Sequence, residues 1–528
     1  MTTPATKLVL LASIGLLSAV SAAEPVKAPP PPPPFTSDAP VAPAVESVNG
    51  FGLDFYRALA KSNPDHNLFL SPYSVSVALT MAAEGAREET ETEMARVLHF
   101  PAAAGNARAI SPVHEAVATL SQRLVAAGTT DPKAKARADE LRVQLDAANK
   151  ESQKFAAAQD WAKAGESQSN ASKIAAELNT LLTQIERFDL RIANALWVER
   201  SYDLSPAYVQ TIDHFYGSGG GGGSGVTPLN IARDPEGSRS HINAWVADHT
   251  EQRIKDIIPP GGLAPSTRLV IANAVYFKGQ WATPFEQSGT KDEEFTAAGG
   301  AKLPVKMMHA GWRWAPYAAF SGNGSPFATP HKIPKDESKR PATYPDDAGF
   351  TMIELPYKGG DLSMLVLSPR SASGLPALES KLSPEALAGW IKHLEARTVD
   401  TAVPRFKVES EINAAATLQA LGMRRAFTDP AEKGGAQFAG ISASQDPSQQ
   451  LYIGSVLHKA WVDVAEKGTE AAAATVVTFA PTSAAVQREE TVPFTPVFRA
   501  DHPFLFVIRD TKSGVILFIG RVASPKAE

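Results

Sequence analysis

Residues 67 to 86, NLFLSPYSVSVALTMAAEGA, constrain the fold more than any other stretch of this chain. They predict a short strand, a turn at Ser71 and Pro72, and then a helix that is apolar on almost every side. Such a helix is stable in water only when other elements bury it all round. Because the chain has 528 residues, 44% of them hydrophobic, it can build a core large enough to do so.

Helix and strand signals alternate along the rest of the chain without a regular βαβ rhythm or an internal repeat. LRIANALWVE and TRLVIANAVYFKG predict strands, whereas HINAWVADHTEQRIKDII predicts a helix. Past residue 290 strand signals dominate. This irregular mixture favours one large α+β domain, which we place at residues 48–528.

Two segments interrupt this domain. Residues 131–187 are rich in Ala, Lys, Glu and Gln, and their apolar residues recur every three or four positions. They predict two antiparallel helices joined around Gly165 to Asn170. We interpret them as an inserted helical hairpin with solvated polar faces, and the alternative is a partner-binding arm. A second, irregular insertion runs from about Ser321 to Asp347.

The N-terminus predicts an exported protein. Lys7 precedes an apolar run, and the small residues after it fit a cleavage site that makes residues 1–22 a signal peptide. Residues 23–47 are proline-rich and predict a disordered tether. The chain has no cysteine, which excludes disulfides and a lipoprotein anchor. We therefore expect a secreted or periplasmic protein, and its lack of disulfides suits a bacterium.

Composition and motifs exclude several functional classes. The net charge is only −5, so neither nucleic acid nor an acidic membrane is an expected partner. HEAVA at His114 lacks the second histidine of a zinc-protease motif, and no G-x-S-x-G elbow occurs. The glycine-rich residues 217–225 lack a Walker lysine. We expect no metal, no cofactor and no catalytic residue.

Residues 466 to 483, EKGTEAAAATVVTFAPTS, suit no single secondary structure. The four alanines favour helix, whereas the β-branched residues after them favour strand. If the segment becomes a strand with Thr469 facing the core, every second residue after it faces the core too, and Glu470 faces water. The further inward residues are then Ala471, Ala473, Thr475 and Val477. These inward side chains are small or β-branched, and a short helix in a flexible loop is the alternative.

Five separated stretches resemble the serpins, in serpin order, from about residue 48 to 525. They are NLFLSPYSVSVALTMAAEGA, LRIANALWV, RLVIANAVYFKGQWATPFE, LHKAWVDVAEKGTEAAAAT and FRADHPFLFVIRDTKSGVILFIGRV. The last is similar to the C-terminal signature of that family, with Asp501, His502, Pro503 and Phe504 at its centre. The chain departs from the family in its two insertions and in a longer segment after the reactive loop.

The resemblance implies three β-sheets, about nine helices and an exposed reactive loop. It implies a suicide inhibitor of serine endopeptidases, with cysteine endopeptidases as an alternative: the protease cleaves the loop, is held as an acyl-enzyme, and is displaced when the cleaved loop inserts into the central sheet. Residues 466–500 would be this loop with its extended C-terminal side. Its hinge would comprise Glu466, Gly468, Thr469, Glu470, Ala471, Ala472, Ala473 and Ala474.

Six further positions match family residues around the central sheet. The family uses a hydrogen-bonded latch where the strands part, and a tryptophan lies near the point where insertion starts. The matching residues are Asn67, Ser71, Ser74, Asn273 and His458 for the latch and Trp281 for the tryptophan. The resemblance gives none of them a catalytic role.

The family's spacing, counted from Glu466, puts the reactive bond at Thr482–Ser483. A small residue before the bond suits an elastase-like or subtilisin-like protease, whereas the alternative, Arg488–Glu489, suits a trypsin-like one. We favour Thr482 because the sheet constrains the length of the hinge. We expect a monomer that forms a covalent complex with its target protease.

Two other classes stay open at this point. A non-inhibitory serpin acting as carrier or chaperone is expected to place proline, charge or bulk at inward hinge positions, and none occurs between Thr469 and Val477. A pure interaction protein would use the helical insertion and would work without the reactive loop.

Overall fold

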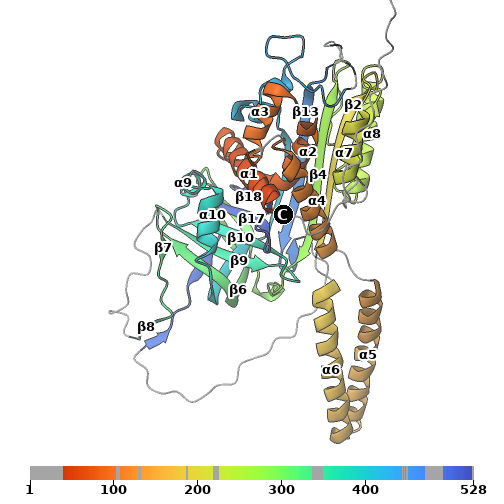
Figure 1. The fold of residues 1–528 in the computed structure, drawn as a ribbon. Coiled ribbons are helices and arrows are strands. Elements are labelled where there is room, and N and C mark those ends of the chain that lie inside the picture. The colour runs from red at the N-terminus through yellow and green to blue at the C-terminus, as the bar shows by residue number, and fades with distance from the viewer. Residues whose placement is uncertain are drawn as a thin grey trace, which may run out of the picture.

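Two large β-sheets, helices packed against them and a projecting pair of helices make up the computed structural model (Figure 1). The structure describes residues 40–102, 108–128, 132–185, 188–217, 225–335, 349–442, 444, 446, 450–469 and 491–525. This architecture confirms the predicted α+β class, and it contains the three β-sheets that the resemblance implies.

The described residues form eleven α-helices, two of which belong to the insertion. They are α1 (Ala42–Ser62), α2 (Pro72–Glu84), α3 (Glu88–Val97), α4 (Ser111–Gly128), α5 (Pro132–Ala157), α6 (Trp161–Ile185), α7 (Pro206–Tyr216), α8 (Pro235–His249), α9 (Leu375–Glu379), α10 (Pro384–Ile391) and α11 (Ala415–Leu421).

The central sheet has six strands in the order β12-β13-β14-β4-β2-β3. They are β2 (Phe188–Glu199), β3 (Gly225–Leu229), β4 (Leu269–Gln280), β12 (Phe406–Asn413), β13 (Ile453–Ala465) and β14 (Gly468–Thr469). Strands β13 and β4 also pair directly, in parallel, from Ile453 with Leu269 to Ala460 with Val275. The sheet is therefore closed along most of these two strands and opened by β14 at one end.

The second sheet has ten strands, and the long strand β6 joins its parts. They are β1 (Leu68–Leu70), β5 (Lys291–Thr296), β6 (Lys302–Phe320), β7 (Pro326–Phe327), β9 (Phe350–Pro356), β10 (Leu362–Pro369), β11 (Glu395–Pro404), β16 (Val497–Arg499), β17 (Phe504–Asp510) and β18 (Ile516–Val522). A third sheet contains only β8 (Lys332–Pro334) and β15 (Thr491–Pro493).

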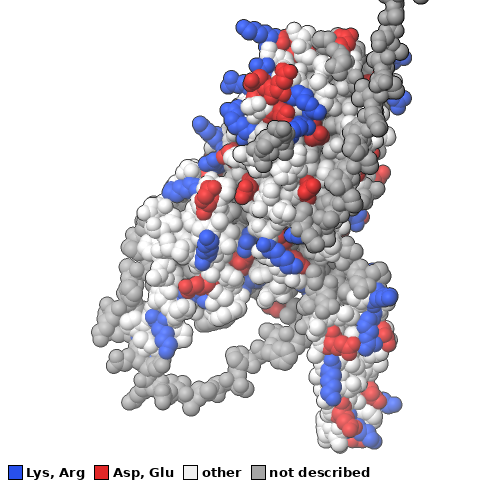
Figure 2. Space-filling view, in the orientation of Figure 1, with Lys and Arg blue, Asp and Glu red and all other residues white. Residues whose placement is uncertain are grey.

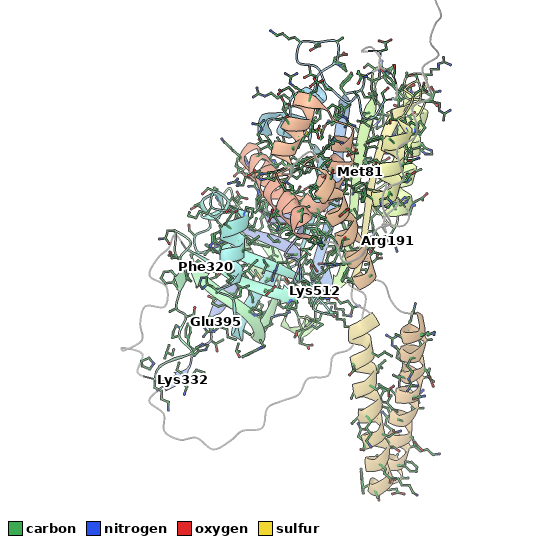
Figure 3. The ribbon with its side chains drawn as sticks, in the orientation of Figure 1. Met81, Arg191, Phe320, Lys332, Glu395 and Lys512 are labelled. Atoms are coloured by element: carbon green, nitrogen blue, oxygen red, sulfur yellow. The ribbon has the colours of Figure 1, made fainter. Side chains whose placement is uncertain are left out.

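The apolar helix predicted after Ser71 is α2, and it lies at the centre of the molecule (Figure 1). Its N-cap is Ser71, whose Oγ accepts the Ser74 N–H at 3.1 Å, and Pro72 occupies the first turn, where a missing N–H costs nothing. All residues from Pro72 to Ala83 are buried, among them Met81, which Figure 3 labels inside the body. The helix therefore holds the two sheets together.

Helix α1 begins earlier than the sequence pattern suggests. The tether predicted for residues 23–47 is wrong for residues 42–47, because these form the first turns of α1 and bury Ala44 and Ser47. The proline at position 43 lies in the first turn, so it starts the helix instead of preventing it. The predicted signal peptide, residues 1–22, lies outside the described residues.

The insertion forms two antiparallel helices, α5 and α6, which project away from the sheets (Figure 1). Ala138, Leu141 and Leu178 are buried where the two helices face each other. This small contact, with partly buried leucines and isoleucine around it, is the hairpin's own core.

The predicted joint at Gly165 to Asn170 is wrong, because these residues lie inside α6. The chain reverses at Ala158 to Asp160 instead, where Gln159 has a φ of 59° and Asp160 Oδ1 accepts the Lys163 N–H at 3.3 Å. A cap by aspartate and a single left-handed residue are sufficient for this turn. Gly165 stays helical at a cost of about 1 kcal/mol.

No helix among the described residues has both the length and the apolar character needed to cross a bilayer.

Candidate functional site

Strand β14 is the structural beginning of the predicted hinge. Its two residues lie between β13 and β4: Thr469 pairs antiparallel with Val464 on one side and Gly279 on the other. Toward the C-terminal ends of β13 and β4, β14 separates these two strands. From Ile453 to Ala460, β13 pairs directly with β4. The hinge therefore enters the central sheet at the junction between its open and closed parts.

Gly468 fits this junction because it has no side chain. Its φ is 148°, a conformation that other residues rarely adopt. A Cβ atom at this position would lie 2.1 Å from the Gly279 carbonyl oxygen and 2.7 Å from the Gln280 Cα. The neighbouring backbone of β4 thus leaves room only for glycine.

Thr469 faces the core, on the same side of the sheet as the interior positions of β13. It is 0% exposed, and its Oγ1 lies 2.8 Å from the Tyr357 hydroxyl, with which it forms a hydrogen bond. Burial raises the pKa of Tyr357 well above its usual range, so this hydroxyl stays protonated. The Trp281 ring stacks on Tyr357 with centroids 4.6 Å apart. Thr469 is thereby fitted into an aromatic pocket.

Trp281 also binds the backbone that precedes the hinge. Its Nε1–H donates to the Ala465 carbonyl at 3.0 Å, and its backbone N–H donates to the Lys467 carbonyl at 2.9 Å. These two bonds hold the turn between β13 and β14. Trp281 therefore lies directly beside the first residues of the predicted hinge.

Glu466 is fixed by a bidentate ion pair. Arg405 Nε and Nη2 donate to the Glu466 carboxylate at 2.9 and 2.6 Å, and the Thr290 hydroxyl donates to the same group. Burial raises the pKa of Glu466, but the hydrogen bonds from Arg405 and Thr290 outweigh it and hold the pKa below its usual range. The Glu466 carbonyl also accepts the Phe285 N–H at 2.8 Å. The hinge therefore starts from a rigid anchor.

A row of three polar side chains crosses the closed part of the sheet. Asn194 of β2 pairs with Asn273 of β4, which in turn pairs with His458 of β13. All three are fully buried and joined by hydrogen bonds between their side chains. Ser74 of α2 joins the row, since its Oγ donates to Asn194 Oδ1 at 2.9 Å and accepts from Asn273 Nδ2. We call these residues, together with Ser71, the latch.

The protonation state of His458 follows from its partners. Its Nε2 accepts the backbone N–H of Ser71 at 3.1 Å, so the proton must lie on Nδ1, which faces the Asn273 side-chain oxygen. Burial lowers the pKa of His458 to about 3. The latch therefore contains a neutral imidazole whose two nitrogens both have partners.

We expect the folded protein to lose stability as the pH falls from about 6.5. In the unfolded chain the His458 imidazole takes up a proton near pH 6.5, whereas in the folded protein it does so only near pH 3. Between these values the unfolded state binds more protons, so this residue costs about 1 kcal/mol per pH unit on acidification. Urea unfolding between pH 5 and 7 measures the slope, and His458→Gln should flatten it. Equal slopes in both proteins would contradict the assignment.

Asn67 lies apart from the latch. Its Oδ1 accepts the Ala523 and Ser524 N–H groups at 2.8 and 2.9 Å, and its Nδ2 donates to the Ser524 carbonyl at 2.7 Å. It therefore fastens the end of β18 and makes no contact with His458 among the described hydrogen bonds. The resemblance alone suggested its place in the latch.

The remaining predicted site residues lie outside the described part of the chain. They are Glu470, Ala471, Ala472, Ala473 and Ala474 of the hinge and Thr482, Ser483, Arg488 and Glu489 of the two candidate bonds.

Sequence reasoning missed four residues of the site: Asn194, Thr290, Tyr357 and Arg405. The sequence contained a signal for Asn194, because the motif IANA that includes Asn273 at residues 271–274 also occurs at residues 192–195. In the antiparallel register of β2 and β4 the two asparagines of these repeats become direct partners. The other three are brought to the hinge from distant strands and loops, and the sequence around them has no comparable pattern.

Acidic and basic side chains are interspersed over the face of the molecule shown in Figure 2, including the hairpin. This mixture is typical of a solvated surface.

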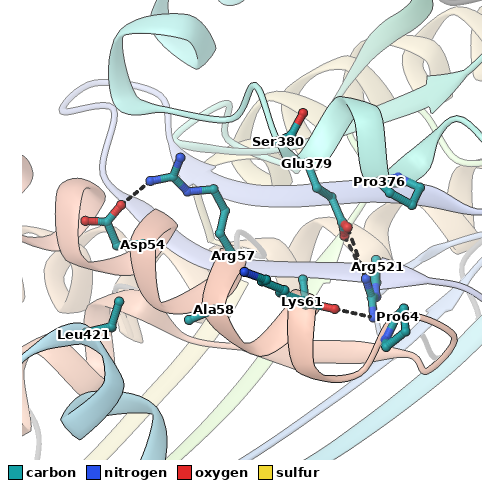
Figure 4. Close-up of a pocket in the computed structure, with 11 residues that line it drawn as sticks. Asp54, Arg57, Ala58, Lys61, Pro64, Pro376, Glu379, Ser380, Leu421 and Arg521 are labelled. Carbon is teal, nitrogen blue, oxygen red and sulfur yellow. Dashed lines mark hydrogen bonds and ion pairs between the residues drawn. The ribbon is translucent and has the colours of Figure 1, made fainter.

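A pocket of about 720 Å³ lies between α1, α9 and β18 (Figure 4). Its wall contains the buried ion pair of Arg521 and Glu379, in which Nη1 and Oε1 are 3.1 Å apart. The Tyr56 hydroxyl donates to the same Glu379 oxygen at 2.6 Å. Arg57 and Lys61 also line it. The pocket shares no residue with the hinge or the latch.

Comparison with known proteins identifies the family. The family model described as "Serpin (serine protease inhibitor)" matches residues 46–525. Human Serpin B3 is 32% identical over 91% of this chain and 99% of its own length. The leukocyte elastase inhibitor of Sus scrofa is 31% identical over 90% of this chain and 97% of its own length. An uncharacterized serpin-like protein of Thermococcus kodakarensis is 31% identical over 92% of this chain and 86% of its own length.

Solved structures share the fold. Uncleaved ovalbumin superposes with a TM-score of 0.63 and 23% identity, covering 91% of this chain and all of that one. Native protease nexin-1 with heparin also has a TM-score of 0.63 and 23% identity, over 92% of this chain. With a family match across residues 46–525 and relatives of similar length, this chain belongs to the serpin family, whose members include protease inhibitors.

Proposed function

We propose that the protein is a suicide inhibitor of serine endopeptidases, with cysteine endopeptidases as an alternative target. Its cleaved reactive loop would insert between β13 and β4 and trap the protease as an acyl-enzyme. The observation that carries this proposal is β14, because the first residues of the hinge already lie between these two strands, antiparallel to both. The protein would act as an inhibitor and not as an enzyme.

The register of β14 predicts where each later residue of the loop would go. Thr469 pairs with Val464 and Gly279, so two residues on, Ala471 would lie opposite Val462 and Phe277. In the same register, Thr475, six residues after Thr469, would lie opposite both His458 of β13 and Asn273 of β4. Insertion therefore has to separate the two latch side chains, and the Thr475 hydroxyl would face the groups that had bonded each other. The small inward residues between these points suit that path.

The chemical step before insertion is ordinary acyl transfer. The hydroxyl oxygen of the protease's serine bonds to the Thr482 carbonyl carbon, the Thr482–Ser483 bond breaks, and the proton of the hydroxyl ends on the new amino group of Ser483. From 469 to 482 the inserted strand would extend roughly 40 Å, at about 3.3 Å per residue. The attached protease would be carried that far along the sheet, and its distorted active site would stall hydrolysis.

Incubation of the purified protein with proteases tests this function. An elastase-like, a subtilisin-like and a trypsin-like protease are each mixed with the protein, and the products are separated in denaturant. We expect a covalent complex with one of the first two, and mass spectrometry of the released C-terminal fragment should show that it begins at Ser483. Cleavage without any covalent complex would contradict the inhibitory function. The monomeric state is tested by light scattering on the same sample.

The pocket beside α1 favours a second candidate, a carrier of a small molecule. Its volume suits a small ligand, and Lys61 would attract an acidic one, whereas Arg57 is already paired with Asp54 in the pocket wall. Binding of an anionic naphthalene dye to the pocket would be measured by fluorescence. Dye binding that a ligand of the protein displaces, and that Lys61→Glu weakens, would support this function.

Export to the periplasm or the exterior remains a proposal that rests on residues 1–22.

A further inference from the structure

Two of the three departures of this chain from the serpin pattern meet in space. Strand β8 belongs to the insertion near residue 330, and β15 belongs to the extra segment after the reactive loop. They pair antiparallel, with Ile333 opposite Val492 and Lys332 opposite Pro493. The sequence gives no sign that these two segments are related, and among the described residues they form the third sheet by themselves.

Strand β8 is fastened to the body of the protein. Arg397 of β11 is only 4% exposed, and it donates to the Thr329 and Pro330 carbonyls at 3.1 and 2.6 Å, just before β8 begins. The Phe494 N–H donates to the His331 carbonyl at 2.9 Å. Figure 3 shows Lys332 on a strand that stands out from the main sheets. A buried arginine therefore holds an otherwise exposed strand in place.

This pairing places an attachment of the downstream chain closer to the second candidate bond. The next attachment of the downstream chain to β11 begins at Pro496, whose carbonyl accepts the Asp400 N–H at 2.9 Å, followed by parallel pairing of β16. Without β8, the loop would be held from Pro496 onward. With β8, it is held from Thr491 onward, close to the second candidate bond.

We propose that β8 is a clamp that determines which bond of the reactive loop a protease can attack, a proposal that rests on the proposed function above. Glu489 is two residues from Thr491, at most about 7 Å of extended chain, whereas Ser483 is eight residues from it, up to about 26 Å. A protease at Arg488–Glu489 would collide with the strand pair. The clamp thus protects the bond after Arg488 from trypsin-like proteases and leaves Thr482–Ser483 to elastase-like or subtilisin-like ones.

Backbone pairing strengthens this effect. A protease binds its substrate as an extended strand and uses the substrate's own N–H and C=O groups. For cleavage after Arg488 the residues that follow the bond are Glu489, Glu490 and Thr491, and the next residue, Val492, is already paired with Ile333 at the centre of the strand pair. The pair must open before the protease can bind there, and the rate then depends on how often it opens.

Replacing Ile333 by proline tests the clamp. Proline cannot donate a ladder hydrogen bond at the centre of β8, whereas Ile333→Val keeps the N–H and the β-branched shape. With trypsin, we expect Ile333→Pro to release the fragment beginning at Glu489 at least about tenfold faster than the parent protein, and Ile333→Val to match the parent. Arg397→Gln, which removes the anchor of β8, should act in the same direction.

Equal release rates in the parent and Ile333→Pro proteins, at unchanged thermal stability, would overturn the clamp. The readout is separate from inhibition. If no protease forms a covalent complex but Ile333→Pro still exposes the bond after Arg488, the clamp stands and the inhibitory function fails. If complexes form but the rate at that bond does not respond to Ile333→Pro, the inhibitory function stands and the clamp fails.

Discussion

Replacing Thr469 by arginine is expected to turn the protein from an inhibitor into a substrate. Thr469 is 0% exposed and contacts Tyr357 in the path that we propose for the inserting strand. An arginine there would bring an unpaired charge into the core, which costs several kcal/mol. Insertion then becomes slower than hydrolysis of the acyl-enzyme. The yield of covalent complex, measured on denaturing gels, should fall at least about tenfold while cleavage of the loop continues.

The matched control is Thr469→Ser, which keeps the hydroxyl that bonds Tyr357 and removes one methyl group. It should retain most of the complex yield. The thermal unfolding temperature of both uncleaved variants shows whether the fold survived. An arginine variant that still forms complex at the parent yield would show that the loop does not insert along this path.

Cleavage in the reactive loop is expected to raise the unfolding temperature by roughly 20 °C. An inserted strand of residues 470–482 would add roughly 20 ladder hydrogen bonds, net of those lost between β13 and β4, each contributing about 1 kcal/mol. For a domain of this size, with an unfolding entropy of about 2 cal/mol/K per residue, that gain corresponds to roughly 20 °C. Differential scanning calorimetry before and after limited proteolysis measures the shift.

The same experiment on Thr469→Arg provides the control for cleavage itself. This variant should be cut equally well but should gain little stability, because the residues after position 469 would stay outside the sheet. A parent protein that gains no more than the arginine variant would mean that cutting, and not insertion, accounts for its properties.

Local patterns in the sequence predicted the elements that depend on neighbouring residues. The apolar stretch after Ser71 gave α2 with its serine cap and early proline. The strand alternation was worked out on the assumption that Thr469 faces the core, and Thr469 is fully buried. The stripe containing Ala138 and Leu141 predicted the contact between α5 and α6. In each case the determining interactions lie within a few residues along the chain.

The rest of the site depends on contacts between distant segments. Arg405 reaches Glu466 across 61 residues, and Tyr357 reaches Thr469 across 112. Nothing near these residues in the sequence marks them as partners. The pairing of β8 with β15 is of the same kind, because it joins short segments with weak strand signals and a register that only the fold fixes.

The crystal structure of the protein cleaved at Thr482–Ser483 tests the central claim most directly. We predict a complete strand from Gly468 between β13 and β4, with Thr475 opposite both His458 and Asn273 and the direct pairing of those two residues lost. A cleaved protein in which β13 and β4 remain paired from Ile453 to Ala460, with Ala471 and the residues after it outside the sheet, would contradict the account.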